Sequence, residues 1–148
     1  MGIRKENREM REIKYIVLHT TASPQNQPVK EILNYWRNVK GWKSPGYHFL
    51  IKADGTYEYL LDISKPSNGV AGYNAHSIHI SYIGGANGVD NRTQGQIGTQ
   101  IFLLNKYMAM FPNAEVKGHR DFLTKGKRGW KECPNFDVSD WLRCAGLK

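Results

Sequence analysis

Three residues of this sequence, His19, His119 and Cys133, could together bind a metal ion. Two imidazoles and a thiolate suit Zn²⁺, and a catalytic zinc site has three protein ligands and a fourth position that is left to water. The three residues lie far apart in the chain, so their spacing alone leaves a second interpretation open. In that interpretation each histidine is an ordinary core or surface residue, and Cys133 is an inert buried thiol.

The elements around these residues predict how they are positioned. Residues 14–19 form a β-rich run that ends at a Thr-Thr-Ala-Ser-Pro turn, which predicts a buried strand with His19 at its C-terminal end. Residues 115–118 predict a short strand that leads into His119, and Cys133 falls in a turn. Strand ends and turns are where an α/β sheet places its working side chains.

Elsewhere the chain alternates strands with helices, which is typical of an α/β protein. Apolar residues at helical spacing predict that the longest helix buries Ile97, Ile101, Leu104 and Met108. We expect one domain, with a central mixed β-sheet flanked by helices. The remaining predicted elements are a helix over residues 28–39 with Trp36 in the core, a hairpin of strands 47–51 and 56–60 joined at Asp54-Gly55, a strand over 77–83, the longest helix from 93 or 94 to 110, and a last helix capped by Asp137.

Length and charge narrow the class of protein. The chain has 148 residues, enough for one domain, and no apolar run approaches the roughly 18 residues of a membrane span. Its formal net charge of +8 favours an anionic partner such as nucleic acid, a membrane surface or a wall polymer. Residues 1–12 form a charged lead-in without the apolar stretch of a signal peptide, so we expect cytoplasmic synthesis and a domain over residues 13–148.

Five segments resemble, in the same order, the motifs of one zinc amidase family. The sequence is similar to the N-acetylmuramoyl-L-alanine amidases of the bacteriophage endolysin and peptidoglycan recognition protein type. This resemblance favours metal binding over the interpretation as ordinary residues. The segments span most of the chain and are Tyr15-Ile-Val-Leu-His19, Gly46-Tyr-His-Phe-Leu-Ile51, Ser77-Ile78 with Gly84-Gly85, Gly118-His-Arg-Asp121 and Cys133-Pro-Asn-Phe-Asp137.

The resemblance implies a role for each site residue. It implies that His19, His119 and Cys133 hold Zn²⁺, that Tyr47 stands beside the metal, and that Lys131 matches a catalytic lysine of the phage amidases. Zinc activates its bound water and polarises the scissile carbonyl. Tyr47 and Lys131 would then stabilise the oxyanion as hydrogen-bond donors. Tyr47 could instead orient or deprotonate the water, and the sequence leaves both roles open.

Two features depart from the family pattern. The loop over residues 121–131 is longer than the usual connection, so Lys127 or Glu132 could occupy the place given to Lys131. His79 stands where the family commonly has glycine after the Ser-Ile pair, so this side chain would either crowd the sheet or point toward the cleft. The sequence does not identify the substrate-binding residues.

We therefore predict a zinc-dependent hydrolase that cleaves the amide between the lactyl group of N-acetylmuramic acid and L-alanine of peptidoglycan stem peptides. We expect a monomer that acts on the bacterial cell wall, with peptidoglycan or a muropeptide as substrate and no specific nucleic-acid or membrane partner. The first alternative is a non-catalytic peptidoglycan-binding module, against which Cys133 argues because such relatives typically lack the metal cysteine. The second is a protein that binds nucleic acid or a polymerase, which the net charge and scattered aromatic residues suggest, but the sequence carries no motif of a nucleic-acid-binding fold.

Overall fold

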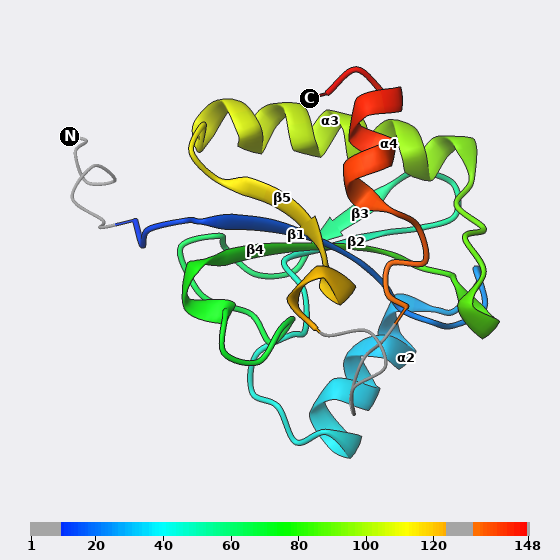
Figure 1. The fold of residues 1–148 in the computed structure, drawn as a ribbon. Coiled ribbons are helices and arrows are strands. Elements are labelled where there is room, and N and C mark those ends of the chain that lie inside the picture. The colour runs from blue at the N-terminus through cyan, green and yellow to red at the C-terminus, as the bar shows by residue number, and fades with distance from the viewer. Residues whose placement is uncertain (1–9, 124–131, 148) are drawn as a thin grey trace.

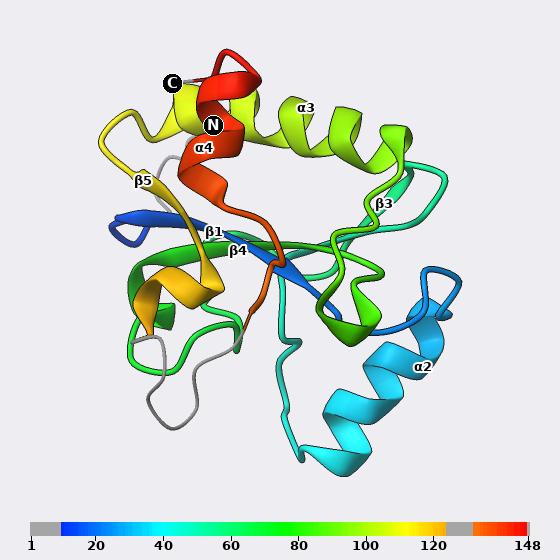
Figure 2. The same ribbon diagram turned by 45° about the vertical axis from the view of Figure 1, so that its right-hand side comes forward.

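A five-stranded sheet with helices on both faces forms the centre of the computed structural model, which describes residues 10–123 and 132–147 (Figures 1 and 2). Four strands run parallel, and β3 pairs antiparallel with β2 at one edge, in the order β3-β2-β4-β1-β5. This mixed α/β architecture is the one predicted. The strands are β1 (Tyr15–Thr20), β2 (Phe49–Ile51), β3 (Tyr57–Tyr59), β4 (Ser77–Tyr82) and β5 (Glu115–Gly118).

The two faces of the sheet have different coverings. Helices α3 (Gln94–Met110) and α4 (Val138–Cys144) pack on one face, where Ile16 and Leu18 of β1 join the larger hydrophobic core. Helix α2 (Val29–Asn34) lies on the opposite side of the sheet (Figure 1). Because side chains alternate along a strand, His19 of β1 belongs to this second face and not to the α3 and α4 side.

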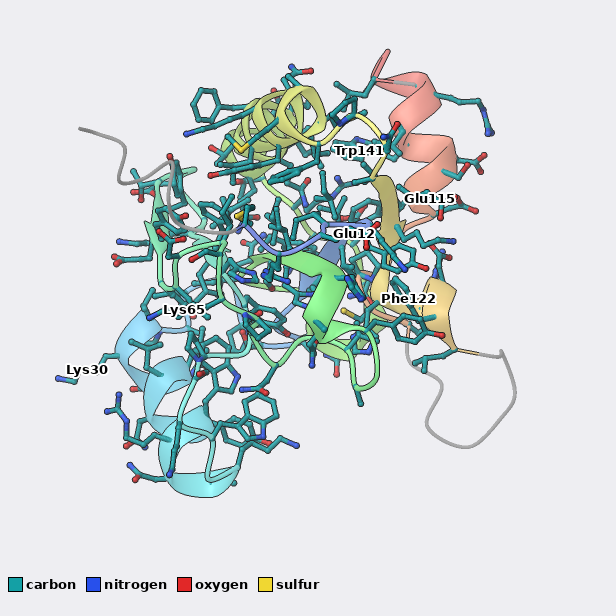
Figure 3. All side chains as sticks on the ribbon, turned by 90° about the vertical axis from the view of Figure 1, so that its left-hand side faces the viewer. Glu12, Lys30, Lys65, Glu115, Phe122 and Trp141 are labelled. Atoms are coloured by element: carbon teal, nitrogen blue, oxygen red, sulfur yellow. The ribbon has the colours of Figure 1, made fainter. Side chains whose placement is uncertain are left out.

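The helix predicted over residues 28–39 is present, but it changes type midway. Helix α2 continues into a π-helical turn over Tyr35–Val39, and Trp36 in that turn is buried as predicted. Ile32 and Trp36 form a second, smaller core with Leu50 of β2. Lys30, by contrast, points away from the molecule (Figure 3). The apolar side of this helix therefore covers the sheet next to the predicted site.

The buried side of α3 differs from the prediction. Of the residues expected there, Leu104 is fully buried, whereas Ile97, Ile101 and Met108 are half-buried. Gln96 takes a central position because its side-chain amide donates hydrogen bonds to the carbonyl oxygens of Ile51 and Ile83, at 3.1 and 3.0 Å. A hydrophobic pattern cannot predict a polar residue that is buried for its hydrogen bonds. The fully buried residues of α3 are Gln96, Gln100, Leu103, Leu104 and Tyr107.

The predicted hairpin and last helix are confirmed. Gly55 has a φ of 92°, a left-handed conformation that glycine adopts readily, in the turn between β2 and β3. The carboxylate of Asp137 accepts the backbone N–H of Asp140 at 3.0 Å and so caps α4. Among the helices of the described ranges, none combines the length and apolar character that crossing a membrane requires.

Candidate metal centre and active site

The three predicted metal ligands lie together in the structure. His19 is at the C-terminal end of β1, His119 directly follows β5, and Cys133 precedes α4. One potential ligand atom from each residue lies within 4.8 Å of the others, and His19 Nδ1 is 3.8 Å from Cys133 Sγ. Tetrahedral zinc with ordinary bond lengths separates a nitrogen from a sulfur ligand by roughly 3.5 Å. The three donors therefore fit a single Zn²⁺ ion.

Hydrogen bonds from two backbone N–H groups position Cys133 next to the residues that follow the two histidines. The N–H of Thr20 points to Cys133 Sγ at 3.2 Å, and the N–H of Arg120 donates to the Cys133 carbonyl oxygen at 2.8 Å. Thr20 and Arg120 are the residues that directly follow His19 and His119. The cysteine is thus aligned by the same two chain segments that supply the imidazoles.

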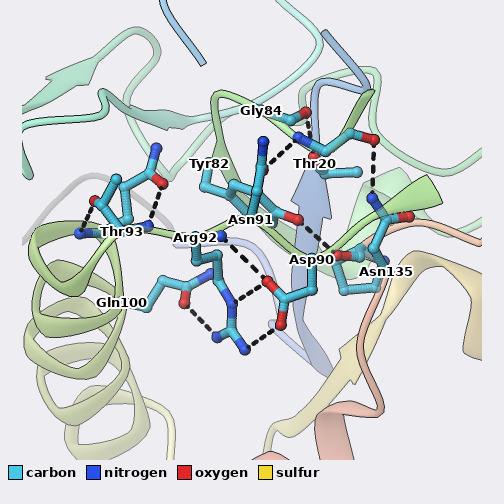
Figure 4. A network of polar contacts seen from close by, with 12 residues as sticks. Thr20, Tyr82, Gly84, Asp90, Asn91, Arg92, Thr93, Gln100 and Asn135 are labelled. Atoms are coloured by element: carbon cyan, nitrogen blue, oxygen red, sulfur yellow. Dashed lines mark hydrogen bonds and ion pairs between the residues drawn. The ribbon is translucent and has the colours of Figure 1, made fainter. Parts of the chain in front are cut away.

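The segment after Cys133 is anchored by a polar network (Figure 4). The side-chain amide of Asn135 donates to the carbonyl oxygens of Gly85 and Val89, each at 3.0 Å. The Tyr82 hydroxyl donates to the carbonyl oxygen of Pro134 at 3.1 Å. Asn135 has a φ of 76°, a left-handed conformation that asparagine tolerates better than most residues. These contacts tie the cysteine loop to the loop between β4 and α3.

Tyr47 lies beside the ligand group, as the resemblance implied. Its ring centroid is 4.6 Å from that of His19 and 5.4 Å from the nearer Trp36 ring centroid. Burial raises the pKa of the Tyr47 hydroxyl, and the nearby Cys133 raises it further, although a hydrogen bond with Ser81 opposes this shift. Because its pKa is raised, the Tyr47 hydroxyl is protonated at neutral pH in the metal-free chain. Tyr47 lies just before β2, which begins two residues later than predicted.

The predicted catalytic lysine, Lys131, and its alternative Lys127 both lie outside the described residues. The other alternative, Glu132, is described, and its exposed carboxylate forms an ion pair with Arg120 at 3.2 Å. Its position next to Cys133 fits the predicted motif, but its charge is already matched by the arginine.

Comparison with known proteins identifies the family of this chain. The family model of N-acetylmuramoyl-L-alanine amidase matches residues 9–136. The chain belongs to this amidase family. The matched range includes His19, Tyr47, His119 and Cys133. The family membership predicted from the five motifs is therefore confirmed.

Relatives of this amidase-family chain include phage proteins. The endolysin of Escherichia phage T7 is 31% identical over 140 residues, which cover 92% of this chain and 88% of the relative. The structure of N-acetylmuramoyl-L-alanine amidase LysC from Clostridium intestinale aligns with a TM-score of 0.77 at 26% identity, covering 93% of this chain and 88% of that one. Human PGRP-IBETAC, in complex with glycosamyl muramyl pentapeptide, shares the fold with a TM-score of 0.67 at 20% identity, covering 82% and 84%.

Sequence reasoning missed the contact that this amidase-family chain makes behind His19. His79 on β4 is fully buried, and its Nδ1 lies 2.8 Å from His19 Nε2. Burial lowers the pKa of His79 well below its usual value, with smaller contributions from His48, His119 and Arg11. Burial likewise lowers the pKa of His48 to about 4. The signal available in the sequence was that His79 replaces the glycine common in the family. Two outcomes were expected for this side chain, crowding the sheet or pointing toward the cleft, and its ring points toward His19 of the site.

Arg11 is a second residue whose role the sequence did not show. Its guanidinium donates hydrogen bonds to five backbone carbonyl oxygens, at 2.9 to 3.1 Å. Four of the five belong to the segment between β3 and β4 and the fifth to the first residue of β4, so one side chain holds that segment against the start of β1. The five acceptors are the carbonyl oxygens of Ile63, Lys65, Asn74, Ala75 and Ser77.

Replacing Arg11 by lysine should destabilise the fold. A lysine has three donors on one nitrogen and cannot reach five separated carbonyl groups, so we expect the free energy of unfolding to fall by about 2 kcal/mol. Urea denaturation measures this change. Arg143→Lys is the matched control, because Arg143 is exposed and pairs with Asp140 on the surface of α4. Equal stability of the two variants would contradict the role given to Arg11.

Proposed function

We propose that this chain is a zinc-dependent N-acetylmuramoyl-L-alanine amidase. It hydrolyses the amide bond between the lactyl group of N-acetylmuramic acid and the L-alanine of peptidoglycan stem peptides. The observation that carries this proposal is the meeting of His19, His119 and Cys133 donor atoms within 4.8 Å in a member of the amidase family. The thiol also favours catalysis over the alternative of a non-catalytic wall-binding module.

The chain's own residues divide the chemical work. Bound Zn²⁺ would supply an activated water and polarise the scissile carbonyl. The ion would be held by His19, His119 and Cys133 beside the C-terminal ends of β1 and β5. Tyr47, whose ring centroid lies 4.6 Å from that of His19, donates a hydrogen bond to the carbonyl oxygen as that oxygen gains negative charge. Lys131 is the second donor that the family motif supplies.

Substrate and place of action are proposed from the family. Peptidoglycan or a muropeptide is the substrate, which agrees with the muramyl pentapeptide bound to the human relative. The net charge of +8 would concentrate the protein on anionic wall polymers, an attraction that salt weakens. We propose that the chain works as a monomer on the cell wall, as an enzyme of the same kind as the phage endolysins to which it is similar.

Mass spectrometry of digested peptidoglycan tests this function. Purified peptidoglycan incubated with the protein should release free stem peptides that begin with L-alanine. Treatment with a chelator should reduce release to background, and added Zn²⁺ should restore it, because the three side chains lose their shared ion. Release that continues after verified metal removal would contradict zinc dependence. Intact peptidoglycan in every sample would favour the binding module.

A further inference from the structure

His79 and His19 form a directed pair of imidazoles behind the candidate metal centre. The two residues lie on the adjacent parallel strands β4 and β1, where His79 is paired with Val17, two residues before His19. His79 Nδ1 lies 2.8 Å from His19 Nε2. The other nitrogen of His79, Nε2, lies 2.8 Å from the side-chain oxygen of Asn74. His19 Nδ1 faces Cys133 Sγ at 3.8 Å. A chain of contacts therefore runs from Asn74 through both rings to the ligand group.

The direction of this chain is set at Asn74. Its side-chain oxygen accepts the backbone N–H groups of Gly69 and Val70, at 3.1 and 2.8 Å. These two donors identify the atom as oxygen, so His79 Nε2 must carry the hydrogen that it shares with Asn74. The Nδ1 of a neutral His79 ring is then an acceptor, and His19 Nε2 must carry a hydrogen in turn. That tautomer leaves the lone pair of His19 Nδ1 available to a metal.

The surroundings of His79 hold its ring in this orientation. A Cβ atom at Gly69 would lie 2.3 Å from His79 Nδ1, so the glycine leaves the space that the ring occupies. The His48 ring stacks on the His79 ring with 6.0 Å between centroids and an interplanar angle of 10°. His48 Nδ1 also accepts the backbone N–H of His79 at 3.0 Å. Arg11 donates to the Asn74 carbonyl oxygen at 3.0 Å and so fixes the end of the chain.

We propose that His79 is a positioning residue for the metal centre, which accepts the Nε2 hydrogen of His19 and thereby fixes the tautomer that presents Nδ1 to the ion. This inference rests on the proposed zinc function for its consequence, whereas the tautomer itself exists without metal. Hydrogen-bond partners of this kind orient ligand histidines and raise their basicity. His79 would therefore strengthen zinc binding without touching the ion or the substrate.

Two substitutions of nearly equal size separate hydrogen bonding from packing. In His79→Asn the amide oxygen replaces Nδ1 as an acceptor for His19, whereas His79→Leu fills similar space without an acceptor. We expect His79→Leu to weaken zinc affinity by about 10-fold to 100-fold and His79→Asn to stay near the wild-type value. Competition with a chromophoric chelator measures these affinities. Equal affinities of the two variants would overturn the proposal, because packing alone would then explain the effect.

The tautomer can be measured directly on the wild-type protein without metal. Long-range ¹H–¹⁵N correlation spectra of the imidazole rings should show hydrogen on Nε2 of both His19 and His79. Hydrogen on Nδ1 of His19 would overturn the inference whatever the variants show. Since this spectrum needs neither zinc nor substrate, its result is independent of the proposed amidase activity. A protein with the expected tautomers that fails to bind zinc would instead contradict the proposed function.

Discussion

Replacing Cys133 by serine should abolish hydrolysis of peptidoglycan and weaken zinc binding. The thiolate is the one anionic ligand of the proposed set, and its Sγ lies 3.8 Å from His19 Nδ1. A serine hydroxyl is a weaker ligand because it stays protonated at neutral pH. We expect stem-peptide release to fall by roughly 10³-fold or more. Zinc affinity should fall by more than the roughly 10-fold to 100-fold loss that follows when a ligand only loses its hydrogen-bond partner. Mass spectrometry and chelator competition measure the two effects.

A second cysteine provides the control for this experiment. Cys144 is exposed near the end of α4 and is not part of the ligand group, so Cys144→Ser should keep both activity and zinc affinity. Thermal unfolding of the metal-free variants shows whether either substitution disturbs the fold. Wild-type activity in a folded Cys133→Ser protein would contradict the metal centre itself, and not only the assignment of one ligand.

The strands and the ligand positions could be predicted because their signals are local. The run at residues 15–20 is β-rich and ends at a turn, so His19 had to lie near a strand end. His119 follows a strand for the same reason, and both strands are parallel neighbours in the sheet. The motif resemblance added what spacing could not give, namely that Cys133 joins them.

The contacts behind the ligands could not be predicted from local patterns. His79 and His19 are 60 residues apart, and Arg11 and Asn74 are 63 apart, so their pairing exists only after the sheet has formed. Sequence analysis could mark His79 as unusual, but the space that it fills depends on Gly69 lacking a side chain. The burial of Gln96 was not predicted for a related reason, since its hydrogen-bond partners are backbone carbonyl groups outside α3.

Replacing Tyr47 by phenylalanine should lower turnover while leaving the metal centre intact. Phenylalanine keeps the ring that packs against His19 and Trp36, so only the hydroxyl is lost. Removing one oxyanion donor from other enzymes lowers kcat by about 10² to 10³. We expect a loss of that size in kcat, with KM close to the wild-type value, because the hydrogen bond strengthens as the carbonyl oxygen gains charge. Steady-state kinetics with a soluble muropeptide measures both constants.

Zinc affinity decides what a loss of activity in Tyr47→Phe means. Tyr35→Phe is the matched control, because Tyr35 is an exposed tyrosine at the start of the π-helical turn after α2. Removal of its hydroxyl should leave kcat unchanged. If Tyr47 acts as the donor, its variant binds zinc as tightly as the wild type and loses only kcat. A parallel fall in zinc affinity would show instead that the hydroxyl supports the ligands, and unchanged kcat would leave the oxyanion to Lys131. The zinc measurement is needed for this distinction because the Tyr47 ring centroid lies only 4.6 Å from that of the ligand His19.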